Sequence, residues 1–270
     1  MPELPEVETV RKTLLKKLKD KKIIDVNLLY PKMFEGNKNL IINKTIKDIK
    51  RRGKWLIFDL GDLYLLSHLR MEGKYFYRNF NDELNKHDLV IFNINNEFEL
   101  RYNDTRRFGK MYLINKKDID ISPISKLGLE PFDSNLNVAY LKEKYKTKNL
   151  PIKSTLLEQD IISGIGNIYA NEILFLSKIN PYKQAKYLND KDLLNIINNT
   201  KTVLNSAIKK GGTTIRSYTS EEGVSGKFQN DLYVHSREFE KCKICKSTIK
   251  REKINGRSTF YCPNCQKNTC

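Results

Sequence analysis

Residues 242–265 read CKICKSTIKREKINGRSTFYCPNC and contain two C-x2-C pairs separated by 16 residues. This spacing is typical of a structural zinc site, because each C-x2-C turn directs two sulfur atoms to one point. The residues between the pairs are long enough for a β-hairpin, with Thr259-Phe260-Tyr261 in the returning strand. We expect one structural Zn²⁺, whose binding supplies the folding energy of a module too small to fold alone. Its predicted ligands are Cys242, Cys245, Cys262 and Cys265.

The fifth cysteine, Cys270, fits neither pair. Two incidental C-x2-C motifs or a redox site are the alternatives to zinc. The first residues, MPELPEVETV, do not resemble a signal peptide, and no apolar stretch approaches the roughly 18 residues that span a bilayer. We therefore expect a cytoplasmic protein without membrane contact, in which disulfides are rare and clustered cysteines bind metal.

The composition favours a nucleic-acid partner. The 270 residues suggest about two domains at about 150 residues each. Apolar residues make up 39% of the chain, enough for a core, and the 30% of charged residues exclude a membrane protein. A formal charge of +17, from 49 Lys+Arg against 32 Asp+Glu, attracts polyanions. The alternative is a genome-wide bias toward Asn, Lys and Ile, which raises the Lys content of any protein.

The first half of the chain predicts one helix followed by a β domain. Apolar residues recur at three- and four-residue spacing over Pro5–Leu18, as on the buried face of a helix. Between residues 23 and 114 short β runs predominate. Two hairpins are expected, one pairing 55–60 with 63–69 and the other pairing 90–94 with 98–102 across Asn95-Asn96. These runs predict a β-sandwich or flattened barrel.

The second half predicts helices and then the zinc hairpin. A stretch near 122–132 contains Pro and Gly and has the composition of a linker. The helices expected after it are Val138–Tyr145, Ser154–Gln159, Asn167–Leu176 and Asp190–Lys210, the last ending at Gly211-Gly212. A Gly/Ser/Thr-rich stretch, 211–227, precedes the cysteines. The fold class is therefore α+β.

The first residues could carry a nucleophile. Met1 precedes a small residue, Pro2, and this order normally permits removal of the methionine. The secondary amine then exposed has the pKa of an α-amino group, about 8, and can attack an aldehyde-like sugar carbon to form an iminium ion. Glu3, beside it, could act as acid and base. The alternative is that these residues merely begin a helix.

Two turns could contact nucleic acid. Residues 163–170, SGIGNIYA, place glycines before a predicted helix, whose amino end can bind a phosphate. The Arg106-Arg107-Phe108 turn offers an apolar wedge beside a guanidinium, which suits the kinking of a duplex. Glycines that serve only helix packing and a charge cluster that is only a solvated surface are the alternatives.

Seven motifs together resemble the formamidopyrimidine-DNA glycosylases, bacterial enzymes of the Fpg/Nei group. In order along essentially the whole chain they are PELPEVET, RRGKWL, HLRMEGKY, NDTRRFG, GIGNIYANE, GGTTIRSY and the GRSTFYC-x2-C hairpin. The resemblance implies an N-terminal catalytic β-sandwich with its helix (1–122), a linker (123–132) and a helix–two-turns–helix DNA-binding domain (133–212). A lesion-recognition loop and connector (213–234) and a four-cysteine zinc finger (235–270) would follow.

The resemblance also implies an activity. The enzyme would excise oxidised purines, 8-oxoguanine and formamidopyrimidines, from damaged double-stranded DNA. It would then nick the abasic site by β,δ-elimination through a Pro2 Schiff base, and it would work as a monomer. The large positive charge would serve the phosphate contacts of a bent duplex with an everted base.

Residue roles are carried over from the matching motifs. Pro2, Glu3 and Lys54 would be catalytic, and Glu6 would orient the damaged nucleotide. Met71, Arg106 and Phe108 would fill the space left by the everted base. The other DNA contacts would be His68, His87, Lys153, Asn167 and Arg257. Residues 217–227 would close over the base.

The chain departs from the family pattern at several positions. Arg70, Ser236 and Lys246 stand where Gly is usual, so strain is expected in the turn at Lys246. Leu89 replaces a second His. His235 replaces a Tyr, which puts a phosphate contact there in doubt and leaves an ordinary surface histidine as the alternative.

Two rival functions remain. Endonuclease VIII-like enzymes excise oxidised pyrimidines, but they usually begin PEGPE, whereas this chain has Leu4. A zinc-ribbon protein that only binds nucleic acid would explain the charge and the cysteines but not the Pro-Glu terminus.

Overall fold

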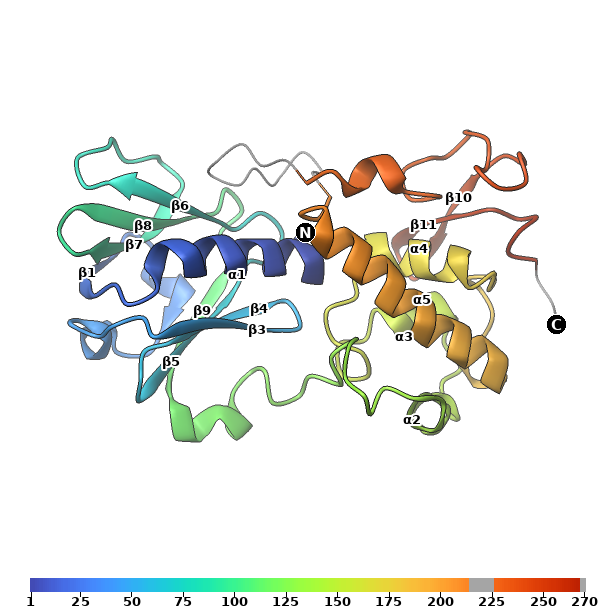
Figure 1. Ribbon diagram of the computed structural model, residues 1–270, viewed down its shortest axis with the longest axis horizontal. Coiled ribbons are helices and arrows are strands. Elements are labelled where there is room, and N and C mark those ends of the chain that lie inside the picture. The colour runs from blue at the N-terminus through green and yellow to red at the C-terminus, as the bar shows by residue number, and fades with distance from the viewer. Residues whose placement is uncertain (214–225, 268–270) are drawn as a thin grey trace. The chain divides into compact units, whose positions relative to one another are not determined.

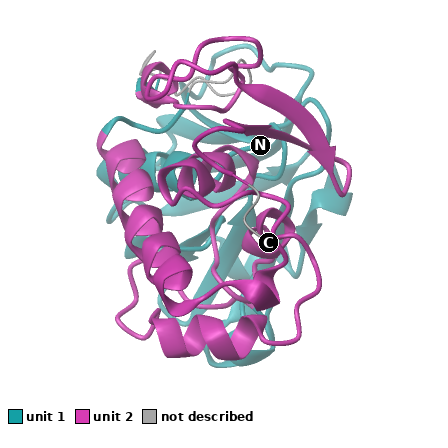
Figure 2. Cartoon of the chain, turned by 90° about the vertical axis from the view of Figure 1, so that its right-hand side faces the viewer, with its two compact units in different colours: residues 1–126, 210–227 teal, residues 127–209, 228–270 magenta. Residues whose placement is uncertain are grey.

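The computed structural model describes residues 1–213 and 226–267. The chain divides into two compact units, shown in two colours in Figure 2. Unit 1 comprises residues 1–126 and 210–227, and unit 2 comprises 127–209 and 228–270. The first boundary falls inside the stretch expected to be a linker, and the chain returns to unit 1 after α5, the last helix of unit 2.

Unit 1 begins with α1 (Leu4–Leu18), one residue earlier than predicted (Figure 1). Glu3 and Glu6 form a capping box at its start, and Pro5 lies in the first turn. The predicted apolar spacing is confirmed, because Val7, Val10, Leu14 and Leu18 are all buried.

Two sheets form the β-sandwich predicted for unit 1. Sheet 1 has the order β2 (Phe34–Glu35), β9 (Lys110–Asn115), β5 (Leu63–His68), β4 (Trp55–Asp59), β3 (Asp48–Arg52). Sheet 2 has the order β1 (Ile23–Leu28), β7 (Asp88–Ile94), β8 (Phe98–Asn103), β6 (Lys74–Asn79). In Figure 1 sheet 2 is drawn above α1 and sheet 1 below it. Buried side chains of α1 and of both sheets make one hydrophobic core.

Both predicted hairpins are confirmed. Strand β4 pairs with β5 from Trp55–His68 to Asp59–Tyr64. Strand β7 pairs with β8 across Asn95 and Asn96, which have φ angles of 54° and 60°. Two consecutive positive φ angles are those of a type I′ turn, which asparagine tolerates.

Unit 2 contains four helices among its described residues: α2 (Val138–Tyr145), α3 (Ile152–Leu156), α4 (Asn167–Leu176) and α5 (Asp190–Lys209). The bounds predicted for α2 and α4 are confirmed. The bounds predicted for α3, Ser154–Gln159, are wrong, because the helix begins at Ile152 and ends at Leu156. Gln159 lies in the turn that follows and stabilises it. The Gln159 amide donates to the carbonyls of Leu157 and Ile165, and its oxygen accepts the Gly164 N–H.

The zinc-finger hairpin consists of β10 (Lys250–Ile254) and β11 (Arg257–Tyr261), joined at Asn255-Gly256. Its buried side chains pack with Phe175 of α4 in a separate small core. Short 3-10 segments occur at η1 (Pro31–Met33), η2 (Lys38–Ile41), η3 (Lys116–Ile121), η4 (Ala185–Tyr187) and η5 (Phe228–Asp231). Within residues 1–213 and 226–267, no helix combines the length and apolar character that crossing a bilayer requires.

Candidate active site and nucleic-acid interface

The amino end of α1 is built around a buried carboxylate. Glu3 and Glu6 are only 2% and 3% exposed, and Pro2 is buried as well. One oxygen of Glu6 accepts the Glu3 N–H at 2.9 Å. The other accepts the Thr213 N–H at 2.8 Å and the Thr213 hydroxyl at 3.2 Å. Glu6 therefore joins the predicted nucleophile segment to the last residue described before 214–225.

Gly212 permits this close approach. Its φ is +81°, and a Cβ there would lie 2.6 Å from the Glu6 carboxylate. Most of the loop expected to close over an everted base, 217–227, lies outside the described residues.

Lys54 is held in the tight turn between β3 and β4. It is 6% exposed and follows Gly53, whose φ is +56°. Arg51 connects this turn to α1. Its Nε lies 3.1 Å from a carboxylate oxygen of Glu8 on α1, and its Nη1 donates to the carbonyl of Gly53 in the turn at 2.9 Å. This chain of contacts fixes the Lys54 turn relative to α1.

His68 shapes the loop that carries Met71. Its Nδ1 accepts the Arg70 N–H at 2.9 Å, and its ring packs edge-on against Trp55 at 4.8 Å between centroids. Burial, together with the positive charges of Arg70 and Lys54, lowers the pKa of His68 to about 3. The imidazole is therefore neutral at physiological pH. A DNA contact by His68 stays a prediction.

The Arg106–Phe108 turn is organised by Asp104, which sequence reasoning missed. Asp104 is fully buried and its carboxylate accepts the N–H groups of Arg106, Phe108 and Gly109 at 3.0, 3.0 and 2.8 Å. The signal was an Asp at the start of a turn, where its side chain mimics a backbone acceptor. Arg106 lies over the Phe108 ring at 4.7 Å, and that ring is 51% exposed. The turn thus presents the apolar wedge beside a guanidinium that its sequence suggested.

His87 lies beside this turn. Its carbonyl accepts the Asp104 N–H at 3.1 Å, and its side chain is half-buried. Its predicted phosphate contact stays a prediction.

In unit 2 the structure brings three predicted DNA contacts together around Ser258. The Lys153 ammonium donates to the Ser258 carbonyl at 2.7 Å and to the Thr259 hydroxyl at 2.8 Å. The Asn167 amide, at the start of α4, donates to the same carbonyl at 3.1 Å. Arg257, next in the chain, is exposed. Lys153 is only 1% exposed, so it ties α3 to the hairpin, and a phosphate contact by its ammonium stays a prediction.

A second set of contacts attaches α4 to the segment that enters the zinc finger. The buried Glu172 carboxylate accepts the N–H groups of Tyr233, Val234 and His235 at 2.7, 3.0 and 2.9 Å. Burial raises the pKa of Glu172 although these three bonds lower it. Sequence reasoning missed this residue, because a Glu inside a helix gives no local signal of three backbone partners.

The interpretation of His235 as a surface residue is wrong. It is 7% exposed, its Nδ1 lies 2.7 Å from the Asn171 amide nitrogen, and its ring packs against Phe260. Burial first, and then the charge of Lys153, lower the pKa of His235 to about 4. A neutral His235 therefore accepts from Asn171 and links α4 to β11.

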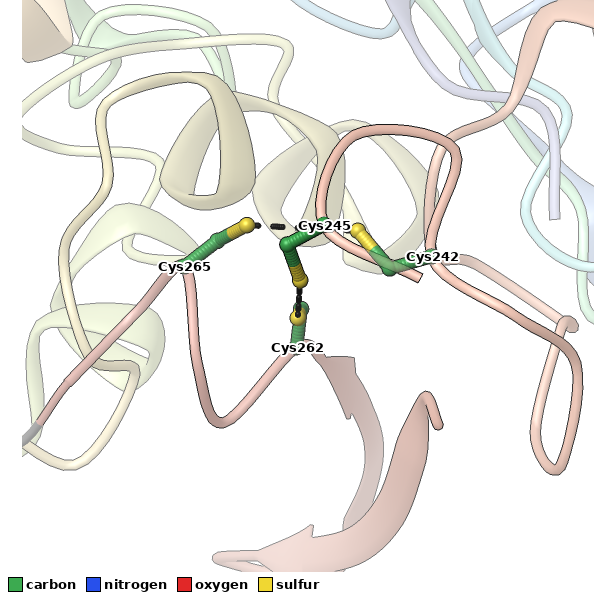
Figure 3. Close-up of side chains that lie close together, drawn as sticks. All are labelled: Cys242, Cys245, Cys262 and Cys265. Atoms are coloured by element: carbon green, nitrogen blue, oxygen red, sulfur yellow. Dashed lines mark hydrogen bonds between the residues drawn. The ribbon is translucent and has the colours of Figure 1, made fainter. Parts of the chain in front are cut away.

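The four predicted zinc ligands converge (Figure 3). All four sulfur atoms lie within 4.8 Å of one another, with 3.4 Å between Cys245 and Cys262 and 3.9 Å between Cys242 and Cys265. A tetrahedral zinc with Zn–S bonds of about 2.3 Å needs sulfur separations of about 3.8 Å. The cluster fits one structural Zn²⁺ with no position left for a substrate. Cys270 lies outside the described residues.

The three positions at which the chain lacks an expected Gly share one conformation. Arg70, Ser236 and Lys246 have φ angles of 53°, 58° and 65°. A side chain in this left-handed region costs about 1 kcal/mol relative to Gly. The strain expected at Lys246 is therefore present, and it occurs at the other two positions as well.

Three family models match most of the chain. Residues 1–111 match the formamidopyrimidine-DNA glycosylase N-terminal domain, 127–219 match the H2TH domain of the same enzymes, and 239–268 match the zinc finger found in FPG and IleRS.

Individual relatives agree with these matches. The formamidopyrimidine-DNA glycosylase of Oceanobacillus iheyensis is 42% identical and covers 99% of this chain and 98% of its own. The formamidopyrimidine-DNA glycosylase of Listeria monocytogenes is 40% identical, and the match covers 99% of this chain and 100% of the relative. A Lactococcus lactis variant bound to DNA containing Fapy-dG superimposes with a TM-score of 0.94 at 39% identity, covering 99% and 100%. The Lactococcus lactis enzyme bound to abasic-site DNA superimposes with a TM-score of 0.93 at 39% identity, covering 98% and 100%. The chain belongs to the formamidopyrimidine-DNA glycosylase family.

Proposed function

We propose that this chain excises oxidised purines, 8-oxoguanine and formamidopyrimidines, from duplex DNA and then cleaves the strand at the abasic site. The observation that carries the proposal, in a member of this family, is the buried Pro2-Glu3 segment. Glu6 accepts the Glu3 N–H with one carboxylate oxygen and the Thr213 N–H with the other. The Lactococcus lactis relatives bound to Fapy-dG and abasic-site DNA support the substrate class.

Pro2 is the nucleophile once Met1 has been removed. Its secondary amine attacks C1′ of the damaged nucleotide, and the glycosidic bond breaks with its electron pair leaving on the base. The amine gives its proton to the departing base, which leaves neutral. Protonated Glu3 then protonates the ring oxygen as the C1′–O bond opens, which produces an iminium ion and a Glu3 carboxylate. The iminium acidifies C2′, so loss of a C2′ proton expels the 3′ phosphate and a further elimination expels the 5′ phosphate. Glu6 orients the nucleotide, and Lys54 contacts the lesion phosphate.

The remaining predicted residues hold the DNA. Met71, Arg106 and Phe108 occupy the space left by the everted base, which offsets part of the unstacking cost. In unit 2, Arg257 and Asn167 contact phosphates from adjoining elements that Lys153 ties together. His68 and His87 add contacts from unit 1. The Zn²⁺ is structural and keeps the Arg257 hairpin rigid. The enzyme acts as a monomer in the bacterial cytoplasm.

Borohydride trapping tests the proposal. The protein, shown by mass spectrometry to lack Met1, is mixed with a duplex carrying 8-oxoguanine opposite cytosine and then reduced. We expect a covalent protein–DNA band that maps to the N-terminal peptide. Pro2→Gly lacks the secondary amine and is the matched control, with a strongly reduced band. Absence of a band from DNA-binding wild-type protein would overturn the lyase mechanism, and preferential cleavage of thymine glycol would overturn the substrate class.

A further inference from the structure

Tyr102 of β8 lies beneath both of the loops that carry the proposed void-filling residues. We call these the Met71 loop (70–73) and the Phe108 loop (104–109). Each loop contains a glycine that the Tyr102 side chain approaches closely. A Cβ on Gly73 would lie 2.0 Å from the phenolic oxygen, and a Cβ on Gly109 would lie 1.9 Å from it. One oxygen atom therefore occupies the space that both glycines leave open.

The same two loops are also joined directly. The Thr105 hydroxyl of the Phe108 loop hydrogen-bonds the Glu72 carboxylate of the Met71 loop. This bond is at the surface, whereas the Tyr102 contacts are buried. The loops are thus connected at two depths, by a hydrogen bond at the surface and by a shared buried neighbour.

The hydroxyl of Tyr102 has no evident role in stability. The residue is fully buried, and its phenolic oxygen has no hydrogen-bond partner among the described residues. Its neighbour Tyr75, packed edge-on against it at 5.1 Å between centroids, donates to the Ser67 hydroxyl at 2.7 Å. A buried hydroxyl without a partner destabilises a fold relative to a phenylalanine of the same shape. A role for the Tyr102 oxygen in supporting the backbones of Gly73 and Gly109 therefore explains its presence better than a role in stability.

We propose that Tyr102 is a positioning residue, whose phenolic oxygen supports the backbones of Gly73 and Gly109 so that Met71 and Phe108 enter the duplex as a single wedge. The inference rests on the proposed function, which assigns these residues to the space left by the everted base. Without the oxygen, both loops can settle toward the core. Misplacement of a contact by about 1 Å can cost up to about 100-fold in rate.

The test compares Tyr102→Phe with Tyr75→Phe. Single-turnover excision of 8-oxoguanine is measured in a fully paired duplex and in a short unpaired bubble, where no stacked base must be replaced. For Tyr102→Phe we expect a loss of about tenfold or more on the duplex and little on the bubble. Its melting temperature should be unchanged or higher, because the unpartnered hydroxyl is gone. Tyr75→Phe should show the reverse, with a lower melting temperature and an unchanged duplex-to-bubble ratio.

A second variant approaches the same contact from the opposite side. Gly109→Ala places a methyl group against the Tyr102 oxygen, so the Phe108 loop must move, and the same selective loss on the duplex is expected. Fluorescence of 2-aminopurine opposite the lesion reports wedge insertion directly and should fall in both variants. A wild-type duplex-to-bubble ratio in Tyr102→Phe overturns the inference. A wild-type enzyme inactive on both substrates overturns the proposed function instead.

Discussion

His68 should make the stability of unit 1 depend on pH. In the folded chain its pKa is lowered to about 3, because the ring is buried beside Trp55 and lies near the positive charges of Arg70 and Lys54. In the unfolded chain its pKa is about 6.5. The unfolded state therefore binds a proton that the folded state excludes. The stabilisation is complete above about pH 6.5 and is lost as the pH falls toward 3.

The magnitude follows from the difference between the two pKa values. Because pH 5 lies about 1.5 units below the pKa of the unfolded histidine, protonation of the unfolded state lowers the free energy of unfolding by about 2 kcal/mol. His68→Asn keeps an acceptor for the Arg70 N–H but does not titrate. The variant should be less stable than wild type at pH 7.5, and this difference should shrink by about 2 kcal/mol at pH 5.

Urea unfolding followed by tryptophan fluorescence measures this difference. Trp55 is the single tryptophan of the chain and lies against the His68 ring, so its emission reports unit 1. Taking the difference between wild type and variant cancels the other groups that titrate between pH 7.5 and 5. A difference that does not change with pH would show that His68 titrates normally, and the account of its burial near two positive charges would be refuted.

Three further predictions concern unit 2. Chelation of the Zn²⁺ should unfold the hairpin that carries Arg257 and weaken DNA binding, measured by fluorescence anisotropy before and after zinc is restored; unchanged binding would exclude a structural role. Glu172→Gln should lower the free energy of unfolding by about 2 kcal/mol, because the amide oxygen can accept only the Val234 and His235 N–H groups and the amide NH₂ then faces the Tyr233 N–H. Thermal unfolding measures this loss, with Glu143→Gln on the exposed face of α2 as the control. Lys246→Gly should remove the strain of a side chain at positive φ and stabilise the zinc finger by about 1 kcal/mol. The variant should lose zinc to a competing chelator more slowly than wild type, and faster loss would contradict the strain.

Features that depend on neighbouring residues were predictable from the sequence. The spacing of the four cysteines, the apolar repeat of α1 and the Asn95-Asn96 turn all follow from local geometry, so zinc ligands, helix and hairpin were correctly expected. The end of α3 was not predictable in this way, because the Gln159 side chain donates to the carbonyls of Leu157 and Ile165 in the turn after the helix. His235 was misjudged because its burial depends on Asn171 and Phe260, neither of which lies near it in the chain.

The sequence alone determined the family, the zinc ligands and which residues are candidates for chemistry, since motif spacing and residue type are local properties. Only the tertiary structure decided how these residues are held. Glu6 meets Thr213 across 207 positions of sequence, and Lys153 meets Ser258 across 105. Tyr102 reaches the two glycines because β8 places its ring under both loops. Such contacts depend on strand register and helix packing, which set the direction of a buried side chain and are not written in any short segment of the chain.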